Sequence, residues 1–281
     1  MSIRGAVVQF VSDAVRAGID LLLPPRCPLC GGDAPGDGLS ALLCATCQEA
    51  LADRTSRACP RCGAGLSMAG ERPTRGADVA APAGVHGSNP PRNGREVSPT
   101  SCPRCRDRRL HFDSALSMGP YCDLRREAVL RMKRPSGESL ARAVGTALAD
   151  RLAAELQSFA GQWVVPVPMY WARRAMRGTN SPQVLAGAVA ARLELPLVGV
   201  LARRRNTRPQ PGLTPRQRFA NVRGAFSIGA GYDLHERRVI LVDDILTTGA
   251  TSSEAARTLR KAGASAVLAV VVARAEGPGA G

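Results

Sequence analysis

An acidic pair followed by a hydroxyl-rich turn is the part of this sequence best suited to chemistry. Asp243 and Asp244 come directly after the apolar run Val239–Val242. The turn that follows offers backbone N–H groups and hydroxyls in close succession, from Thr247, Thr248, Gly249, Ala250 and Thr251. Such a turn can hold one phosphate, and two carboxylates can accept hydrogen bonds from a vicinal diol. The pattern therefore predicts a site for a ribose that carries a 5′-phosphate.

The residues around the turn predict the elements that position it. The run Val239–Val242 is typical of a buried parallel strand, and a helix with periodic apolar residues begins at Thr251 and stops at Gly263. The apolar run 266–273 completes a βαβ unit. Ligands bind at the carboxyl ends of strands in open α/β sheets, so the turn lies where a ligand is expected. The alternative is a capped strand–turn–helix without a ligand.

Four Cys-x-x-Cys pairs in the first part of the chain predict two structural zinc sites. Each pair supplies two thiolates from a tight turn, and two pairs close a tetrahedral site. Taken in order along the chain, the first site uses Cys27, Cys30, Cys44 and Cys47, and the second uses Cys59, Cys62, Cys102 and Cys105. The order is also compatible with an interleaved pairing. We expect zinc rather than a disulfide framework, because no secretory signal precedes the cysteines.

The thirteen residues Val239–Thr251 resemble the phosphoribosyl-pyrophosphate (PRPP) signature of type I phosphoribosyltransferases. The resemblance implies that Asp243 and Asp244 contact the ribose hydroxyls, that residues 247–251 hold the 5′-phosphate, and that Mg²⁺ accompanies PRPP. A pair of zinc ribbons ahead of such a domain is the layout of the ComF family, which is named for a bacterial competence protein.

Shorter motifs between these two parts match the same family in order. They are Tyr121, Lys133, Val165-Pro166-Val167-Pro168, Arg177-Gly178-x-Asn180, Asn206-Thr207-x-x-Gln210-x-x-Leu213, Arg218-x-x-Asn221 and Gly224-Ala225-Phe226. Thr179 and Ser181 depart from the Arg-Gly-Phe-Asn-Gln run that is usual in the family.

The same comparison makes the turn after Pro168 the expected pyrophosphate loop. It implies that the diphosphate is contacted by four cations, which are Lys133, Arg173, Arg174 and Arg177. The alternative is that these cations are solvated surface charges. The basic segment 203–218 is expected to be either a cover over the site or a plain linker.

Composition and the family layout together predict the organisation of the chain. We expect an amphipathic helix at 1–24, a double zinc ribbon at 25–110, an α/β domain at 111–275 and a disordered tail at 276–281. The insertion 67–100 is rich in Gly, Pro, Ala and Arg, and is expected to be disordered. The α/β domain is predicted to be an open parallel sheet flanked by helices, as in type I phosphoribosyltransferases.

Within this domain, the periodicity predicts further elements. The apolar periodicity predicts a helix over residues 123–156, with a break at Pro135–Gly137, and another helix over residues 180–193. Residues 163–168 and 195–201 are expected to be strands.

The charge of the chain favours polyanionic partners. The formal net charge is +15, and almost all of the positive charge is arginine. Single-stranded DNA or RNA would bind in a salt-sensitive way. Aromatic residues make up only 4% of the chain, so no base-stacking platform is evident.

The expected function is that of a PRPP-binding, ComF-like protein linked to DNA uptake and natural transformation. It would transfer the phosphoribosyl group to an acceptor that the sequence does not identify, with release of pyrophosphate. The alternative is a non-catalytic accessory protein that binds single-stranded DNA, in which the PRPP site is regulatory or vestigial.

We expect a cytoplasmic protein whose partners are PRPP and proteins of competence or DNA uptake. Direct membrane association is not expected, because Asp13, Arg16 and Asp20 interrupt the predicted amphipathic helix. The catalytic base and the oligomeric state have no signature in the sequence.

Overall fold

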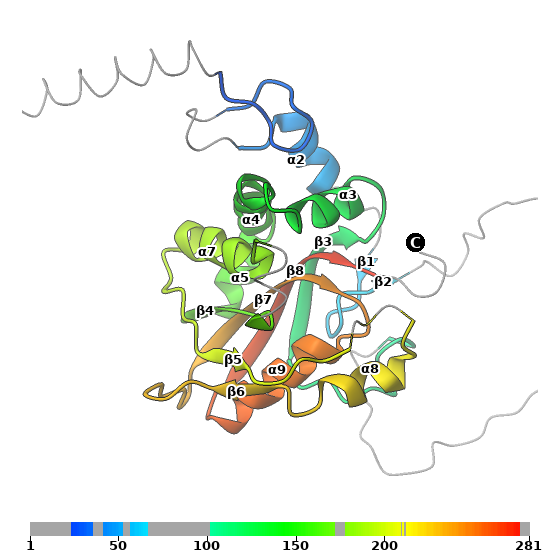
Figure 1. The fold of residues 1–281 in the computed structure, drawn as a ribbon, viewed down its shortest axis with the longest axis vertical. Helices are drawn as coiled ribbons and strands as arrows, with labels where there is room; N and C mark the ends of the chain where they lie inside the picture. Colours follow the sequence, from blue (N-terminus) through cyan, green and yellow to red (C-terminus); the bar gives the residue numbers. More distant parts are fainter. Residues whose placement is uncertain are drawn as a thin grey trace, which may run out of the picture.

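A four-stranded parallel sheet forms the centre of the computed structural model (Figure 1). The structure describes residues 24–35, 42–52, 57–66, 102–171, 178–208, 210 and 212–275. The sheet has the strand order β3-β8-β7-β4. Its strands are β3 (Ser114–Pro120), β4 (Trp163–Pro166), β7 (Arg238–Leu246) and β8 (Ala266–Arg274). The two central strands, β7 and β8, therefore come later in the chain than the two edge strands.

The apolar run predicted as a buried strand is confirmed. Residues 239–242 are each at most 1% exposed, and β7 pairs in parallel with β8 on one side and with β4 on the other. A strand with neighbours on both edges and helices on both faces is expected to be apolar throughout. The strand continues to Leu246, so Asp243 and Asp244 lie within its last part rather than after its end.

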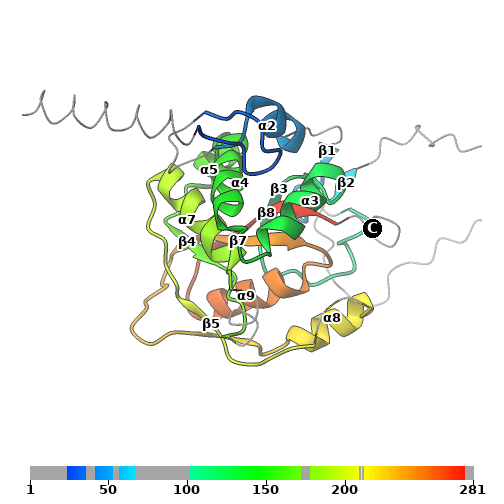
Figure 2. The same ribbon diagram turned by 45° about the horizontal axis from the view of Figure 1, so that its top comes forward.

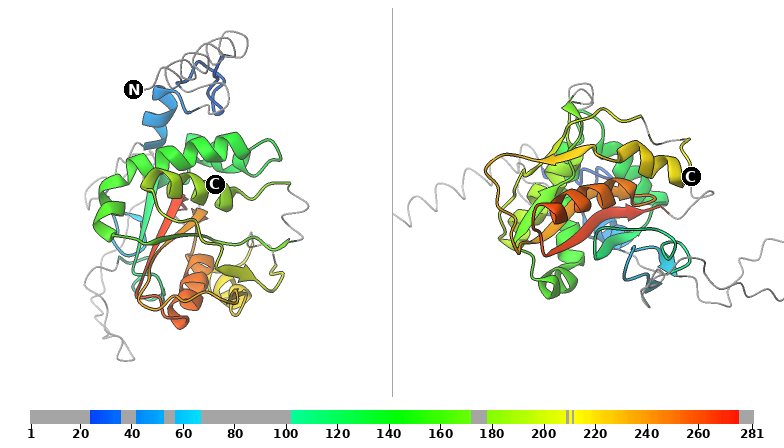
Figure 3. Two further views of the ribbon diagram at one scale, coloured as in Figure 1. Left: turned by 90° about the vertical axis from the view of Figure 1, so that its left-hand side faces the viewer. Right: turned by 90° about the horizontal axis from the view of Figure 1, so that it is seen from below.

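Helices cover both faces of the sheet (Figures 1 and 3). One face carries α3 (Asp123–Met132), α4 (Glu138–Arg151), α5 (Ala153–Phe159) and α7 (Ser181–Leu193), and the opposite face carries α9 (Ala250–Lys261) and α8 (Pro215–Val222). Alternate residues of β7 point to the two faces: Ile240 and Val242 pack with the first set of helices, and Val239 and Leu241 pack with α9. The predicted open sheet flanked by helices is thereby confirmed.

The predicted helix break at Pro135–Gly137 is also confirmed, since α3 ends at Met132 and α4 begins at Glu138. The prediction of a strand at 195–201 is wrong. Only Leu197 forms a bridge, parallel to Val164, in a stretch that contains Pro196 and Gly199. The short strand β5 (Leu201–Arg203) instead pairs in antiparallel fashion with β6 (Phe226–Ile228). Strand β3 is a part of the sheet that the sequence analysis missed.

The first cysteine-containing module, residues 24–35 and 42–52, lies over α3 and α4 (Figure 2). It includes α2 (Ala45–Ala52). Arginines of the underlying helices donate hydrogen bonds to its backbone carbonyls. Arg131 reaches Pro28 O at 2.9 Å, Arg125 reaches Leu51 O at 2.9 Å, and Arg151 reaches Ala52 O at 3.2 Å.

The second cysteine-containing module packs into the core on the α9 side of the sheet. It consists of the hairpin β1 (Arg57–Ala58) and β2 (Gly65–Leu66) together with the segment that begins at Cys102. The two modules therefore belong to two different hydrophobic clusters, one on each face of the sheet.

Several predicted segments lie outside the described residues. They are the helix at 1–24 except for Pro24, the insertion 67–100 and the tail 276–281. Among the described residues, no helix combines the length and apolarity needed to cross a bilayer.

Candidate functional site

A pocket of about 540 Å³ opens at the carboxyl end of β7. The residues predicted to form the ribose-phosphate site make up much of its wall: Asp243, Asp244, Thr247, Gly249, Ala250 and Thr251. Thr248 does not line the pocket. Its side chain is buried, its hydroxyl accepts a hydrogen bond from Ala250 N at 3.3 Å, and its carbonyl accepts one from Arg108. The hydroxyl of Thr248 therefore shapes the turn from within.

The two carboxylates have different surroundings. Asp244 Oδ2 lies 3.0 Å from the Nζ atom of Lys133, the residue that ends α3. Asp243 Oδ1 accepts a hydrogen bond from Asp244 N at 2.9 Å. Burial raises the pKa of Asp243 to about 8, and the neighbouring charge of Asp244 adds to the rise, against the smaller effects of that N–H group and of the cations Lys133 and Arg203. The Asp243 carboxyl group therefore keeps its proton to a higher pH than an ordinary aspartate does.

The turn between β7 and α9 requires glycine at position 249. Gly249 has φ of +82°, and a Cβ atom there would lie 3.3 Å from Leu110 Cδ2. This backbone conformation brings the first turn of α9 to the pocket, where Ala250, Thr251 and Ser252 form part of the wall. The amino terminus of a helix carries partial positive charge and free N–H groups, so this part of the wall favours an anion.

The basic segment 203–218 contributes to the pocket and is not a plain linker. Arg203, Gln210 and Arg218 all line the cavity. Gln210 Nε2 donates a hydrogen bond to Thr251 Oγ1 at 2.8 Å, which holds the segment against the predicted phosphate turn. The guanidinium group of Arg203 lies over the Phe226 ring, 5.4 Å from its centroid.

The predicted pyrophosphate contacts are only partly described. Lys133 lines the pocket, whereas Arg173, Arg174 and Arg177 lie outside the described residues, so their role stays a prediction. The residues just before them, Val167, Pro168 and Met169, line the same cavity. Ser181, which departs from the family motif, is buried, and its hydroxyl donates a hydrogen bond to Met132 O at 3.2 Å.

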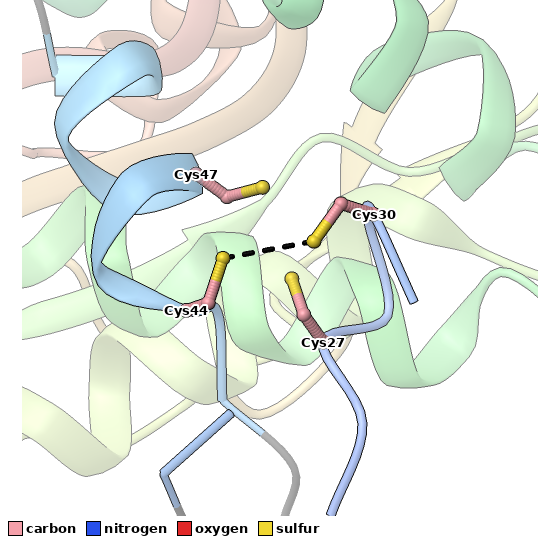
Figure 4. A group of neighbouring side chains, drawn as sticks. All are labelled: Cys27, Cys30, Cys44 and Cys47. Atoms are coloured by element: carbon pink, nitrogen blue, oxygen red, sulfur yellow. Dashed lines mark hydrogen bonds between the residues drawn. The ribbon is translucent and has the colours of Figure 1, made fainter. Parts of the chain in front are cut away.

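The eight cysteines of the Cys-x-x-Cys pairs form two groups of four, arranged in chain order. One group is Cys27, Cys30, Cys44 and Cys47, and the other is Cys59, Cys62, Cys102 and Cys105. Within each group the sulfur atoms lie within 4.8 Å of one another, and no disulfide joins them. Figure 4 shows the first group, in which the four sulfurs converge and Cys30 Sγ lies 3.6 Å from Cys44 Sγ. Four convergent thiols fit a tetrahedral zinc ion.

The second cysteine group is connected by Arg274 to the turn between β7 and α9. The side chain of Arg274 is only 3% exposed, and its Nε atom donates a hydrogen bond to Cys62 O at 2.9 Å. Its Nη1 atom donates to Leu246 O at 2.8 Å and to Thr247 O. Sequence analysis missed this residue, although an arginine at the end of the apolar run 266–273 was a signal that could have identified it.

The segment after Cys105 makes further contacts with the turn and α9. Arg108 Nη1 donates to Thr248 O at 3.3 Å, and His111 N donates to Ser253 Oγ at 3.1 Å. The second cysteine group thus belongs to the same packed unit as the turn.

Comparisons with known proteins match both parts of the chain. The phosphoribosyl transferase domain family matches residues 183–280, and the double zinc ribbon domain family matches residues 18–77. Competence protein F of Haemophilus influenzae is 36% identical over 114 residues, which are 40% of this chain and 50% of that protein. DNA utilization protein YhgH of Escherichia coli K12 is 32% identical over 105 residues, which are 37% of this chain and 45% of that protein. The chain belongs to the ComF family.

Other matches of this ComF-family chain are to phosphoribosyltransferases. Adenine phosphoribosyltransferase of Mycobacterium avium is 41% identical over 91 residues, 32% of this chain and 49% of that protein. Among solved structures, glutamine PRPP amidotransferase from B. subtilis matches with a TM-score of 0.36 and 23% identity, over 53% of this chain and 30% of that one. The ComF-family chain spans about half the length of these curated relatives.

The zinc ribbon match and the two cysteine groups together support zinc binding by this ComF-family protein. Cys102 and Cys105 lie beyond the residues that the ribbon family matches, yet their sulfurs complete the second group.

Proposed function

We propose that this ComF-family protein binds PRPP together with Mg²⁺ in the pocket at the carboxyl end of β7. The observation that carries the proposal is the convergence of an acidic pair, a glycine-containing turn and a helix amino terminus on one cavity. A phosphorylated ribose needs acceptors for its hydroxyls and donors for its phosphate, and these two sets of groups stand side by side in the wall. The match to the phosphoribosyl transferase domain supports the same ligand.

In this proposal each part of the wall has one task. Asp243 and Asp244 accept hydrogen bonds from the ribose hydroxyls, and residues 247–251 bind the 5′-phosphate through their backbone N–H groups and the exposed hydroxyls. Lys133, with Arg173, Arg174 and Arg177, neutralises the diphosphate. When bound, Mg²⁺ supplies further positive charge beside the diphosphate oxygens.

In the absence of ligand, Lys133 and Asp244 form an ion pair with each other. The two groups lie 3.0 Å apart and are both largely buried, so each partly satisfies the other in the absence of ligand. A diphosphate offers Lys133 a partner of higher charge, and the ribose hydroxyls offer Asp244 new donors. PRPP binding is therefore expected to exchange one internal ion pair for several contacts with the ligand.

We further propose that the bound phosphoribosyl group is transferred to an acceptor with release of pyrophosphate. Such a displacement develops positive charge at the anomeric carbon and negative charge on the departing diphosphate. In this proposal the leaving group is stabilised by Lys133, Arg203 and Arg218, which line the described wall. The proposed link to DNA uptake rests on the names of the relatives, competence protein F and DNA utilization protein.

A second candidate function is binding of single-stranded DNA without catalysis. The same relatives' names and the net charge of +15 favour it. An affinity for DNA that falls steeply with salt, together with no pyrophosphate release in the presence of PRPP and candidate acceptors, would support this function over the transferase.

Calorimetric titration with PRPP and Mg²⁺ tests the main proposal, with the zinc content of each protein measured first. We expect the double variant Asp243→Asn/Asp244→Asn to bind PRPP about tenfold or more weakly than the wild type, because each substitution replaces an acceptor oxygen by an amide donor beside the ribose hydroxyls. The matched control Glu194→Gln removes one exposed carboxylate outside the pocket and should bind as the wild type does. No binding by the wild type, or equal binding by the double variant, would overturn the proposal.

A further inference from the structure

A second pocket, of about 730 Å³, lies between α8 and α9. Its volume is in the range of small-molecule sites. Its walls come from α8, from the outward side of α9, and from Arg109 and His111, which follow the second cysteine group. Ala250, in the first turn of α9, belongs to the walls of both pockets. The two cavities are therefore neighbours separated by one turn of helix.

The second pocket has an excess of positive charge. Its wall holds one carboxylate, Glu254, and five cations, which are Arg109, Arg223, Arg257, Arg260 and Lys261. Glu254 accepts a hydrogen bond from Arg257 Nε at 2.8 Å, and Arg260 is paired with Asp113. In the part of the chain that the structure describes, Arg109, Arg223 and Lys261 have no carboxylate partner within 4.0 Å. These three cations remain available to an anion.

The cations of this pocket also affect the pKa of His111. Burial lowers the pKa of His111, and the charges of Arg109 and Arg257 lower it further. The imidazole is therefore held neutral by surroundings that disfavour one more positive charge. Such surroundings favour a negatively charged ligand.

The wall contributed by α8 is apolar and aromatic. Phe219 is half-buried and packs against the core on the α9 side, and Ala220 and Val222 lie beside it in the wall. An aromatic side chain beside small apolar groups offers a nucleobase an apolar surface. An inorganic anion would leave this surface unused, and an uncharged aromatic molecule would leave the cations unused.

We propose that the pocket between α8 and α9 binds a nucleoside phosphate, either as a free nucleotide or as one unit of a single nucleic-acid strand. Arg109, Arg223 and Lys261 supply the positive charge that attracts the phosphate, since guanidinium and ammonium groups are the usual phosphate partners. Phe219 carries the base. The proposal is independent of PRPP binding in the first pocket, because none of these four residues lines that pocket.

Titration with AMP tests the free nucleotide. The variant Arg223→Gln/Lys261→Gln removes two exposed cations of the pocket, and the matched control Arg204→Gln/Arg216→Gln removes two exposed arginines that line neither pocket. We expect the pocket variant to bind AMP about tenfold or more weakly than the wild type, and the control to bind AMP as the wild type does.

AMP also carries a ribose 5′-phosphate, so the titration is repeated with Asp243→Asn/Asp244→Asn, in which the first pocket is impaired. Retention of AMP binding in that protein supports the second pocket. A single-stranded oligodeoxythymidylate of about ten nucleotides then distinguishes the two sources of ligand. Two results together would identify the ligand as a nucleic-acid strand. The wild type would bind the oligonucleotide much more tightly than AMP, and the pocket variant would bind the oligonucleotide more weakly than the wild type.

Two results would overturn the proposal. One is equal affinity of the wild type and the pocket variant for both AMP and the oligonucleotide, and this includes the case in which neither ligand binds. The other is an equal loss of affinity in Arg204→Gln/Arg216→Gln and in Arg223→Gln/Lys261→Gln, because binding would then follow the total charge of the protein and not this pocket.

Discussion

The carboxyl group of Asp243 couples the stability of the fold to pH. Its pKa rises from an ordinary value of 3.8 to about 8 in the folded protein. Between these two values the folded state binds more protons than the unfolded state, so this residue makes stability fall as the pH rises. We expect the free energy of unfolding of Asp243→Asn to fall less between pH 5 and pH 8 than that of the wild type, as measured by urea unfolding of the zinc-loaded proteins.

The comparison is between the two pH slopes, because other groups that titrate in this range, such as the thiols, are common to both proteins. Parallel slopes for the wild type and Asp243→Asn would show that the Asp243 carboxyl titrates normally.

Substitution of Arg274 is expected to lower the stability of the fold strongly. Its guanidinium group is buried and satisfies carbonyl groups at Cys62, Leu246 and Thr247. We expect Arg274→Met to lower the free energy of unfolding by about 3 kcal/mol, because buried carbonyls lose their donors. The matched control Arg204→Met removes an exposed arginine and should change stability by less than about 0.5 kcal/mol. Urea unfolding measures both, and similar values for the two variants would contradict the assigned role.

The two cysteine groups are expected to differ in their effect on the proposed PRPP site. The first packs on α3 and α4, whereas the second is joined through Arg274 to the turn between β7 and α9 and shares a core with α9. We expect Cys30→Ser and Cys62→Ser each to lose one of two zinc ions per chain by metal analysis. PRPP affinity measured by calorimetry should fall more in Cys62→Ser.

Each of these variants is the control for the other, because both remove one thiolate. Equal PRPP affinities in the two variants would show that the contacts through Arg274 do not influence the turn. A wild type with fewer than two zinc ions per chain would contradict the grouping itself.

The elements around the phosphate turn could be predicted because several local signals agree there. The apolar run, the turn glycine, the helical periodicity and Gly263 all indicate the same βαβ unit. Strand β3 could not, because its sequence from Ser114 to Pro120 contains glycine, proline and two serines, and β8 beside it supplies the pairing. At 195–201 the β-branched residues suggested a strand, but Pro196 and Gly199 limit the pairing to one bridge.

The same limit applies to the site. Sequence motifs identified Asp243, Asp244 and Lys133, yet they did not indicate that Lys133 and Asp244 are paired, because the two residues are distant in sequence and meet only after α3 packs on the sheet. The pocket between α8 and α9 has no motif at all. Its cations come from three separate segments, and only the fold brings them together.

At the scale of the whole molecule, removing the segment 67–100 tests whether the second cysteine group forms without it. Cys62 and Cys102 flank this segment, and their sulfurs lie 3.6 Å apart. A short glycine–serine linker can therefore replace residues 67–100. We expect the shortened protein to keep two zinc ions per chain and the PRPP affinity of the wild type, as measured by metal analysis and calorimetry.

Loss of one zinc ion in the shortened protein would show that the segment supports the second cysteine group. Loss of PRPP binding with both zinc ions retained would show that it contributes to the ligand site.

The net charge of the molecule overstates the charge that is available to a polyanion. Arg125 and Arg274 are buried, and together with Arg131 and Arg151 they donate hydrogen bonds to backbone carbonyls. These four arginines therefore have a structural use. Binding of a nucleic acid has to be argued from particular surfaces, such as the pocket between α8 and α9, rather than from the total charge.

The strand order β3-β8-β7-β4 has a consequence for folding during synthesis on the ribosome. All eight cysteines of the two groups precede β3, so both sets of thiols are synthesised before any strand of the central sheet. The edge strands β3 and β4 emerge next, but their partners β8 and β7 are synthesised much later. Strands β3 and β4 therefore stay without their sheet partners until translation reaches β7 and β8.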